Sequence, residues 1–327
     1  MRAAWYDQQG PAGQVLQVGE LPDPTPDLGE VRVRVRYSGV NPGDTKKRRG
    51  WLGSSMPYPR VIPHSDASGV IDSVGNGVAP DRVGRRVWVY GAQSYRPFGT
   101  AAEYVIVPQH LAVDLPDNVT DEIGACLGIP GITAHRAVFG SGPVVGTTVL
   151  VHGVLGGVGA LAGQLARWGG ATVLGTVRRS ADLLEHRILA ADHVIALDHP
   201  DPVGEIRRLT GGVGVDRIVE VSFSDNADLD AAVARVGTVI AAYATHEDRP
   251  TFPFWPMLFN NVTIQLLGSD DFPTEAKRQA ATDLTRAAAA GALESIAGEA
   301  LPLARIADAH DRVDSSNRER VLLAVGG

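Results

Sequence analysis

The sequence predicts an α/β protein with two domains, one β-rich and one built on a doubly wound parallel sheet. Residues 1 to about 120 contain short Val-rich runs separated by Gly, Pro and Asp, which is typical of strands and turns. From residue 147 onward, strand-like runs alternate with helical segments, and six such strands favour a parallel sheet. The 327 residues also exceed what a single hydrophobic core usually organises.

Within the β-rich part, the clearest pattern is a strand of alternating character. Val31, Val33 and Val35 alternate with arginines, so one face of this strand should be buried and the other exposed. From residue 120 to 139 the pattern becomes helical, with an interruption at Pro130 and Gly131. This change marks the passage toward the second domain.

The last 60 residues follow the predicted parallel sheet. They contain one long helical pattern, Thr274 to Leu293, and a final strand, Arg320 to Ala324. We expect this tail to return to the first domain. The predicted domains are therefore residues 1–122 with 269–327, and residues 123–268 as an insertion.

The stretch from residue 147 to 180 carries the main functional signal. It reads as strand, glycine loop, helix and strand, with the helix ending at Gly169 and Gly170. In such a loop Gly156 lets the backbone approach a pyrophosphate at the helix N-terminus, and Gly159 lets the helix pack closely on the strand. A strict G-x-G-x-x-G would carry glycine where this chain has Val154. With both flanking strands present, the pattern predicts a dinucleotide site rather than a purely structural turn.

The end of the second strand of this unit indicates which dinucleotide is bound. NAD sites usually carry Asp or Glu there for the ribose 2′-hydroxyl, but this chain reads Thr176, Val177, Arg178, Arg179 and Ser180. Two guanidinium groups and a hydroxyl suit a 2′-phosphate, so the sequence predicts NADPH. The alternative is a pair of solvated arginines at the start of a helix.

Composition excludes several classes of function. The formal net charge of −7 gives no support to nucleic-acid binding, and no apolar run is long enough to span a membrane. The N-terminal residues do not resemble a signal peptide, and the single cysteine, Cys126, excludes an internal disulfide. We therefore expect a cytoplasmic protein.

Five stretches spread over the chain resemble one known family. They are VNPGDTKKRRG at 40–50, HSDASGVIDSVGNGV at 64–78, GIPGITAHRAV at 128–138, VHGVLGGVG at 151–159 and PLARIADAH at 302–310. In this order they resemble the quinone oxidoreductase branch of the medium-chain dehydrogenase/reductases, which includes zeta-crystallin. The resemblance implies a GroES-like catalytic domain, a Rossmann domain, NADPH in the cleft between them, and a homodimer or homotetramer.

The resemblance also implies site residues. Asn41 and Thr133 would lie near the nicotinamide and its ribose, while Lys46 stands where the family commonly has Tyr and is either a donor to substrate or a solvated cation. Ser222 and Tyr243 end the fourth and fifth strands of the parallel sheet, at the edge where ligands bind. The expected catalytic residues are Asn41, Lys46 and Thr133. The expected cofactor contacts are Asn41, Thr133, Gly156, Gly157, Val158, Gly159, Thr176, Arg178, Arg179, Ser222, Tyr243 and Leu267.

The same resemblance argues against a bound metal ion. Zinc members of the superfamily hold the metal with Cys and His, and the position of the first metal-binding cysteine corresponds to Ser38. His64 and Asp66 supply two ligands at most, which is too few for a zinc site. Asp44 and Arg48 match the family motif, and they are either a structural ion pair or catalytic.

These observations predict a zinc-independent oxidoreductase that transfers hydride from NADPH to quinones or other conjugated carbonyls. Two alternatives remain open at this point. One is a reductase of α,β-unsaturated acids or thioesters, of the enoyl or 2-haloacrylate type. The other is a crystallin-like protein that binds NADPH without catalysis. In each case the partner is a small molecule rather than a nucleic acid or a membrane.

Overall fold

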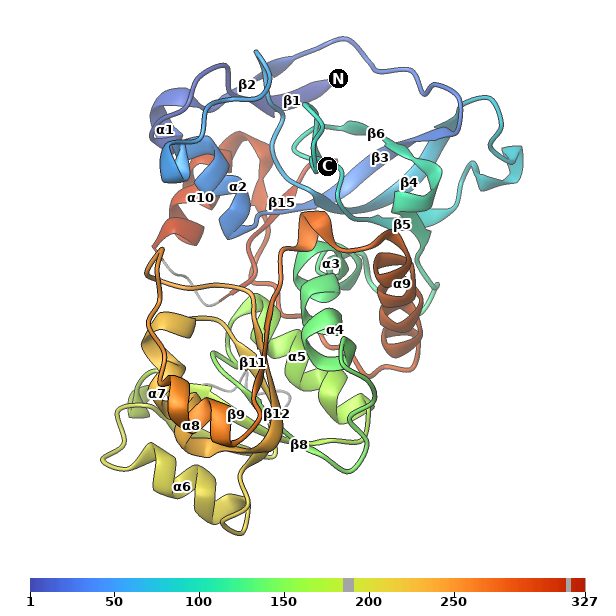
Figure 1. Ribbon diagram of the computed structural model, residues 1–327. Coiled ribbons are helices and arrows are strands. Elements are labelled where there is room, and N and C mark those ends of the chain that lie inside the picture. Colours follow the sequence, from blue (N-terminus) through green and yellow to red (C-terminus); the bar gives the residue numbers. More distant parts are fainter. Residues whose placement is uncertain (185–190, 316–318, 327) are drawn as a thin grey trace. The chain divides into compact units, whose positions relative to one another are not determined.

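The chain forms two compact units, which are described separately. The computed structural model describes residues 1–184, 191–315 and 319–326 (Figure 1). The first unit comprises Met1–Pro130 and Ser295–Gly327, and the second comprises Gly131–Glu294. The second unit is thus inserted into the first along the sequence.

The first unit is dominated by a seven-stranded, mainly antiparallel sheet with the path β14-β15-β3-β4-β5-β7, in which β6 also pairs with β3. A separate pair, β1 and β2, lies outside this sheet. The strands are β1 Arg2–Trp5, β2 Gln17–Glu20, β3 Glu30–Gly39, β4 Asp66–Val74, β5 Arg86–Val89, β6 Tyr104–Pro108, β7 Ala112–Asp114, β14 Leu301–Pro302 and β15 Leu322–Ala324. The helices are α1 Ala12–Val15, α2 Pro42–Arg49, α3 Asp121–Gly124 and α10 Ile306–Asp314.

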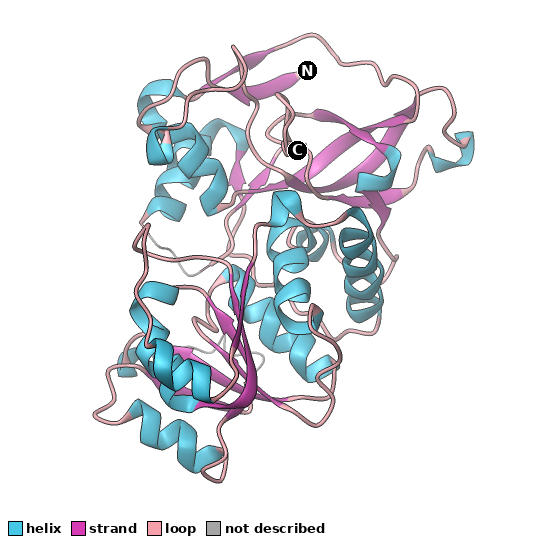
Figure 2. Ribbon diagram, viewed as in Figure 1, coloured by secondary structure: helices cyan, strands magenta, loops and turns pink. Residues whose placement is uncertain are grey.

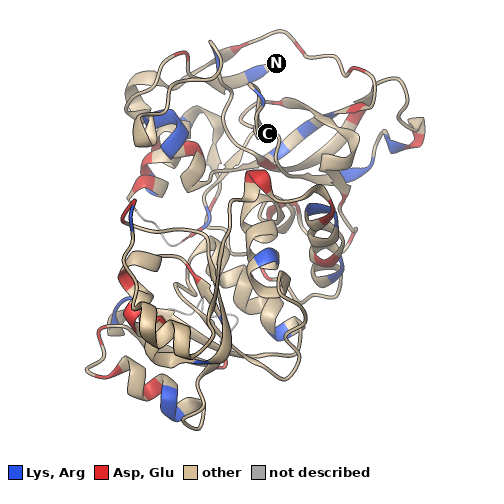
Figure 3. Ribbon diagram, in the orientation of Figure 1, with Lys and Arg blue, Asp and Glu red and all other residues tan. Residues whose placement is uncertain are grey.

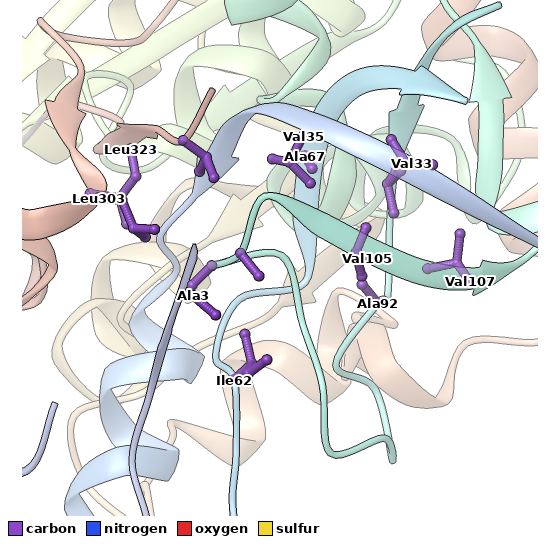
Figure 4. Packing of buried hydrophobic residues seen from close by; sticks show 14 of the residues in the cluster. Ala3, Val33, Val35, Ile62, Ala67, Ala92, Val105, Val107, Leu303 and Leu323 are labelled. Carbon is purple, nitrogen blue, oxygen red and sulfur yellow. The ribbon is translucent and has the colours of Figure 1, made fainter. Parts of the chain in front are cut away.

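The alternation predicted for β3 is confirmed. Val31, Val33 and Val35 are fully buried, whereas the arginines between them reach the surface or are half-buried. Figure 4 shows Val33 and Val35 in the core with Val105 from β6 and Leu323 from β15. Burial of each such aliphatic side chain contributes about 1.5–3 kcal/mol, so this face of β3 anchors the first unit.

The C-terminal strand closes the first unit. β15 pairs antiparallel with β3, with Leu322 opposite Gly39 and Ala324 opposite Tyr37. The strand begins two residues later than the sequence suggested. Arg320 instead forms an isolated bridge with Ala297 and points its side chain into a buried polar cluster.

The second unit contains a six-stranded parallel sheet in the order β10-β9-β8-β11-β12-β13 (Figure 2). Helices α4 and α5 pack on one face, and α6 and α7 pack on the other. This is the predicted doubly wound arrangement. Its strands are β8 Thr148–Val151, β9 Thr172–Val177, β10 His193–Ala196, β11 Val215–Glu220, β12 Ala234–Ala242 and β13 Thr263–Leu266. Its helices are α4 Ile132–Phe139, α5 Gly157–Trp168, α6 Pro202–Leu209, α7 Phe223–Val233, α8 Phe254–Phe259 and α9 Thr274–Ala289.

Two details of this unit differ from expectation. The helix considered to begin at Arg178 and Arg179 is instead a short 3-10 turn over Ser180–Leu184, and residues 185–190 lie outside the described residues. The long helix expected to reach Leu293 ends at Ala289. By contrast, α5 ends as expected, with Gly169 as its C-cap and Gly170 in the left-handed region.

The compact units also divide at other places than the predicted domains, which were residues 1–122 with 269–327, and 123–268. Helix α9 belongs to the second unit, because its buried face packs against α4 and Asp283 bonds His135 at 3.0 Å. The helix follows the last parallel strand in sequence, so its assignment depends on this tertiary contact.

Figure 3 shows Lys and Arg interspersed with Asp and Glu in both units.

Candidate functional site

The glycine loop after β8 lies at the carboxyl edge of the parallel sheet. Gly153 has φ 66°, in the left-handed region, and its carbonyl accepts the N–H of Gly156 at 2.8 Å. A Cβ at Gly159 would collide with that same carbonyl oxygen. The loop therefore folds tightly onto the first turn of α5, and glycine is required at both 153 and 159.

Val154, the departure from the strict fingerprint, does not point toward the helix N-terminus. Its side chain is buried with Val177 of β9 and Ala196 of β10. The left-handed backbone conformation falls on Gly153 instead. Valine is thus accommodated because position 154 contributes to the core, while Gly153 makes the turn.

The N-terminus of α5 is suited to an anion. In the described chain no side chain caps this 12-residue helix, and its first turn carries no acidic residue. A Cβ placed on Gly157 would meet no atom within 4 Å, so the space over the helix end is open. Uncapped N–H groups and the helix dipole favour a phosphate there.

The residues after β9 form the second part of this edge. Arg178 and Arg179 are exposed, and Arg179 lies 3.8 Å from the Asp182 carboxylate. Ser180 donates its hydroxyl to Asp198 at 2.6 Å and its backbone N–H at 2.8 Å. Two guanidinium groups are available at this strand end, but the Ser180 hydroxyl already has an acidic partner.

The other predicted cofactor residues of the second unit fall on the same edge. Ser222 lies just beyond β11, Tyr243 follows β12 directly, and Leu267 follows β13. The strands are parallel, so these positions share one side of the sheet with the glycine loop. Thr176 differs, because it is fully buried and its hydroxyl lies 3.0 Å from His152 Nδ1 within the fold.

Of the three expected catalytic residues, Asn41 and Lys46 lie on or beside α2 in the first unit. The Asn41 amide is buried; its Nδ2 donates to Asp66 at 2.7 Å and its Oδ1 accepts from Arg320 at 2.7 Å. The Lys46 ammonium lies 4.4 Å from the centre of the Trp51 ring, a cation–π contact. Thr133, in α4, is buried within the second unit.

Arg320 and Asp66 organise the surroundings of Asn41, and sequence reasoning missed the arginine. Arg320 Nη2 bonds Asp66 Oδ2 at 2.6 Å, and the other Asp66 oxygen accepts the N–H of Ile129 at 2.7 Å. The partners are 254 residues apart in sequence. No local pattern could have revealed this pair, which fixes the Asn41 amide between a carboxylate and a guanidinium.

A second buried series of hydrogen bonds includes Ser38, the position that the sequence resemblance relates to a metal-binding cysteine. Ser38 Oγ lies 2.9 Å from His64 Nδ1, and His64 Nε2 lies 3.0 Å from His310 Nε2. Arg48 donates its Nε–H to His310 Nδ1 at 3.3 Å. Both ring nitrogens of His64 are therefore hydrogen-bonded within the protein, and the Arg48 guanidinium lies at the end of this series of hydrogen bonds.

This arrangement does not fit a zinc ion. Ser38 offers a hydroxyl in place of a thiolate, and the nearby Arg48 charge would repel a divalent cation. Burial lowers the pKa of His64, so its imidazole is neutral and hydrogen-bonded at both nitrogens. Arg48 bonds Asp314 at 2.9 Å rather than Asp44, whose carboxylate accepts the Asn41 backbone N–H at 2.7 Å.

Within the described residues, one other group of side chains has the spacing of metal ligands. His152, Glu220 and Asp230 are all buried below the glycine loop, with their ligating atoms within 4.8 Å of one another. The His152 Nε2 to Asp230 Oδ1 distance of 2.9 Å is that of a hydrogen bond. Sequence reasoning did not identify this group, whose members come from three separate elements.

Comparison with known proteins agrees with the two-part organisation. Residues 27–117 match the alcohol dehydrogenase GroES-like domain family, and residues 157–282 match the family described as zinc-binding dehydrogenase. The second match covers α5 and the strands from β9 to β13.

No helix in the described chain has both the length and the apolar character needed to cross a bilayer.

Full-length relatives give the same result. A quinone oxidoreductase of Pongo abelii is 30% identical over 94% of this chain and 92% of its own length. The crystal structure of an NAD-dependent alcohol dehydrogenase superposes with a TM-score of 0.88 at 28% identity, over 100% of both chains. A mycobacterial protein solved in complex with NADPH superposes with a TM-score of 0.82 at 27% identity, over 99% of both.

The GroES-like part, the doubly wound sheet and its phosphate-type glycine loop therefore agree with relatives that match nearly the entire chain. The chain belongs to the quinone oxidoreductase branch of the medium-chain dehydrogenase/reductase superfamily and is an oxidoreductase of the NAD(P)-binding dehydrogenase type.

Proposed function

We propose that this protein is a zinc-independent, NADPH-dependent reductase of quinones or other conjugated carbonyls. The observation that carries the proposal is the carboxyl edge of the parallel sheet. It combines an uncapped α5 N-terminus with two exposed arginines, Arg178 and Arg179, at the end of β9. These features suit a pyrophosphate and a 2′-phosphate respectively.

The preference for conjugated acceptors follows from the groups available around Asn41. A saturated ketone that accepts hydride develops a localised alkoxide, which usually needs a strong acid or a metal beside it. The Ser38–His64 pair does not fit a metal, and Asn41 supplies only a neutral amide. A quinone or enone spreads the negative charge by conjugation, so neutral donors are sufficient.

We propose Asn41 and Thr133 as neighbours of the nicotinamide half, with bound NADPH supplying the hydride. Asn41 Nδ2 carries a second hydrogen beside the one that it donates to Asp66, and a threonine hydroxyl can both donate and accept. Lys46 is assigned a role at the rim, where its cation–π contact with Trp51 holds the ammonium. The proposed phosphate contacts are Gly156, Gly157, Val158 and Gly159.

The experiment that tests this function is NADPH oxidation with 9,10-phenanthrenequinone and 1,4-naphthoquinone, repeated with NADH. The proposal expects turnover of both quinones and a clear preference for NADPH. Binding of NADPH without turnover of any quinone or enone would reject the proposed activity. Equal efficiency with NADH would reject the assignment of the 2′-phosphate site.

We further propose that the protein forms a homodimer through β13. β13 is an edge strand of the parallel sheet in the described chain, and Leu266 on it is 79% exposed. The preceding helix α8 exposes Trp255 and Phe259, whose rings stack 6.0 Å apart. An apolar edge of this kind favours pairing with a second copy.

We also propose that the protein is cytoplasmic, because its single, buried Cys126 suits a reducing compartment.

A further inference from the structure

A buried polar chain runs beneath the glycine loop of the second unit. His152 directly follows β8, Thr176 lies in β9, and Asp230 lies in α7. His152 Nδ1 is 3.0 Å from Thr176 Oγ1, and His152 Nε2 is 2.9 Å from Asp230 Oδ1. All three side chains are at most 1% exposed, so these contacts are shielded from water.

The direction of the hydrogen bonds follows from the partners. A carboxylate only accepts, so His152 Nε2 carries a hydrogen and donates it to Asp230. The other ring nitrogen, Nδ1, forms a hydrogen bond with the Thr176 hydroxyl. The Thr176 oxygen in turn accepts the backbone N–H of Gly153 at 3.3 Å. The chain therefore begins at Asp230 and ends on the first glycine of the loop.

The Gly153 peptide is the part of the loop that determines the position of α5. Its carbonyl accepts the Gly156 N–H and touches the first turn of the helix at Gly159. Thr176 bonds the backbone on both sides of Gly153. Its hydroxyl oxygen accepts the Gly153 N–H, and its backbone carbonyl accepts the N–H of Val154 at 3.1 Å. A shift of Gly153 would therefore turn the N–H groups at the helix end.

Glu220 extends the same network to the loop after β11. Its Oε2 lies 3.5 Å from His152 Nε2, and its other oxygen accepts the backbone N–H of Ser222. Asn226 donates to both Glu220 oxygens at 3.1 Å. One buried network thus supports two loops on the carboxyl edge of the sheet.

We propose that His152 is a positioning residue for dinucleotide binding, which acts through Thr176 to fix the Gly153 peptide and aim the α5 N-terminus at the pyrophosphate. The inference deepens the proposed function and depends on its dinucleotide site. His152 touches neither cofactor nor substrate in this account. Its contribution is to affinity for the cofactor rather than to the hydride transfer itself.

The first test replaces Thr176 with Val, which keeps the shape and the β-branch but removes the hydroxyl. NADPH affinity, measured by calorimetry without any acceptor, should fall about tenfold, equivalent to about 1.4 kcal/mol. The kcat at saturating NADPH should stay within about twofold of the wild type, and Thr176→Ser should restore affinity. Thr172→Val, at the exposed start of the same strand, is the matched control and should bind NADPH normally.

A second pair of variants keeps the inference falsifiable if His152 is needed for stability. His152→Asn retains an amide near the Nδ1 position that can bond the Thr176 hydroxyl, whereas His152→Leu removes both contacts, and both variants leave Asp230 without its donor. Their thermal midpoints should fall alike, but only His152→Leu should lose NADPH affinity strongly. Unchanged affinity in Thr176→Val, or equal loss in both His152 variants, would overturn the inference. Failure of the wild type to bind NADPH or NADH would instead reject the proposed function.

Discussion

His64 Nε2 and His310 Nε2 lie 3.0 Å apart in the interior of the first unit, with their rings stacked at 5.2 Å between centroids. Because Arg48 Nε can only donate, His310 Nδ1 accepts, so His310 carries its hydrogen on Nε2. His64 then accepts at Nε2 and donates from Nδ1 to Ser38. The Ser38 hydroxyl continues to Thr100, which donates to the backbone carbonyl of Asp66 at 2.8 Å.

This relationship predicts that the two imidazoles contribute less to the stability of the fold as the pH falls. Burial lowers the pKa of His310 to about 3, with a further contribution from Arg48, and burial also lowers the pKa of His64. Below the usual pKa of 6.5, these two histidines are protonated in the unfolded chain but remain neutral in the folded protein. Their contribution to stability should therefore fall as pH drops from 6.5 toward 3, by up to about 1.4 kcal/mol per pH unit for each imidazole. Burial raises the pKa values of Asp44 and Glu220 to about 7, which acts in the opposite direction, so the effect is measured against a His310 variant.

Urea midpoints at pH 7.5, 6.5, 5.5 and 4.5 measure this effect. His310→Asn keeps an acceptor for Arg48, so the variant should be less stable than the wild type at pH 7.5, and this difference should shrink as the pH falls. His246→Asn, an exposed control, should keep the wild-type slope. An unchanged slope in His310→Asn would mean that the buried imidazole does not have the lowered pKa.

The choice of cofactor is tested by Arg178→Ala combined with Arg179→Ala. Each charge-assisted contact contributes about 1.5–3 kcal/mol and the two overlap, so NADPH binding should weaken by about 2–4 kcal/mol. NADH binding should hardly change, because it lacks the 2′-phosphate. Arg278→Ala, an exposed arginine on α9, serves as the control and should leave both dissociation constants unaltered. A parallel loss of NADH affinity would assign the arginines another role.

Zinc independence predicts that purified protein contains zinc well below one atom per chain and that EDTA leaves activity intact. Elemental analysis and an assay before and after chelation measure both. Ser38→Cys sharpens the test, because it adds a thiol beside His64 while His64 Nε2 stays bonded to His310 and Arg48 stays nearby. The variant should also purify without stoichiometric zinc. One zinc per chain in the wild type, removed together with activity by chelation, would refute the account.

Much of the fold could be predicted from the sequence because its signals are local. The alternation of Val31, Val33 and Val35 fixes which face of β3 is buried, and glycine spacing locates the loop before α5. Even Val154 has a simple explanation once Gly153 is seen to make the turn. Patterns of this kind depend on neighbours within a few residues.

The polar interior could not be predicted in the same way. His152 meets Asp230 across 78 residues, and Arg320 meets Asn41 across 279. Whether a buried His or Arg finds such a partner depends on the register of the sheets. For the same reason, the sequence did not show that α9 packs against α4, or that Thr176 faces the interior rather than the cofactor side.

The proposed homodimer predicts that Leu266→Glu shifts the protein toward monomers. A carboxylate on an exposed edge strand would be desolvated in a paired interface, which costs far more than its exposure in the monomer. Light scattering after size exclusion measures the mass directly. Val213→Glu, at a 55% exposed apolar position in a loop, is the control and should leave the mass unchanged. A wild-type protein that is monomeric at micromolar concentration would contradict the proposal.

The proposed reaction is direct hydride transfer to a conjugated carbonyl without a metal. The most direct measurement is NADPH consumption with cyclohexenone, cyclohexanone and a simple quinone under one set of conditions. The quinone or the enone should be reduced at least about tenfold more efficiently, in kcat/KM, than cyclohexanone, a difference of about 1.4 kcal/mol in transition-state stabilisation. If cyclohexanone were the best of the three substrates, the site would have to contain an acid that stabilises a localised alkoxide, and the account would be wrong.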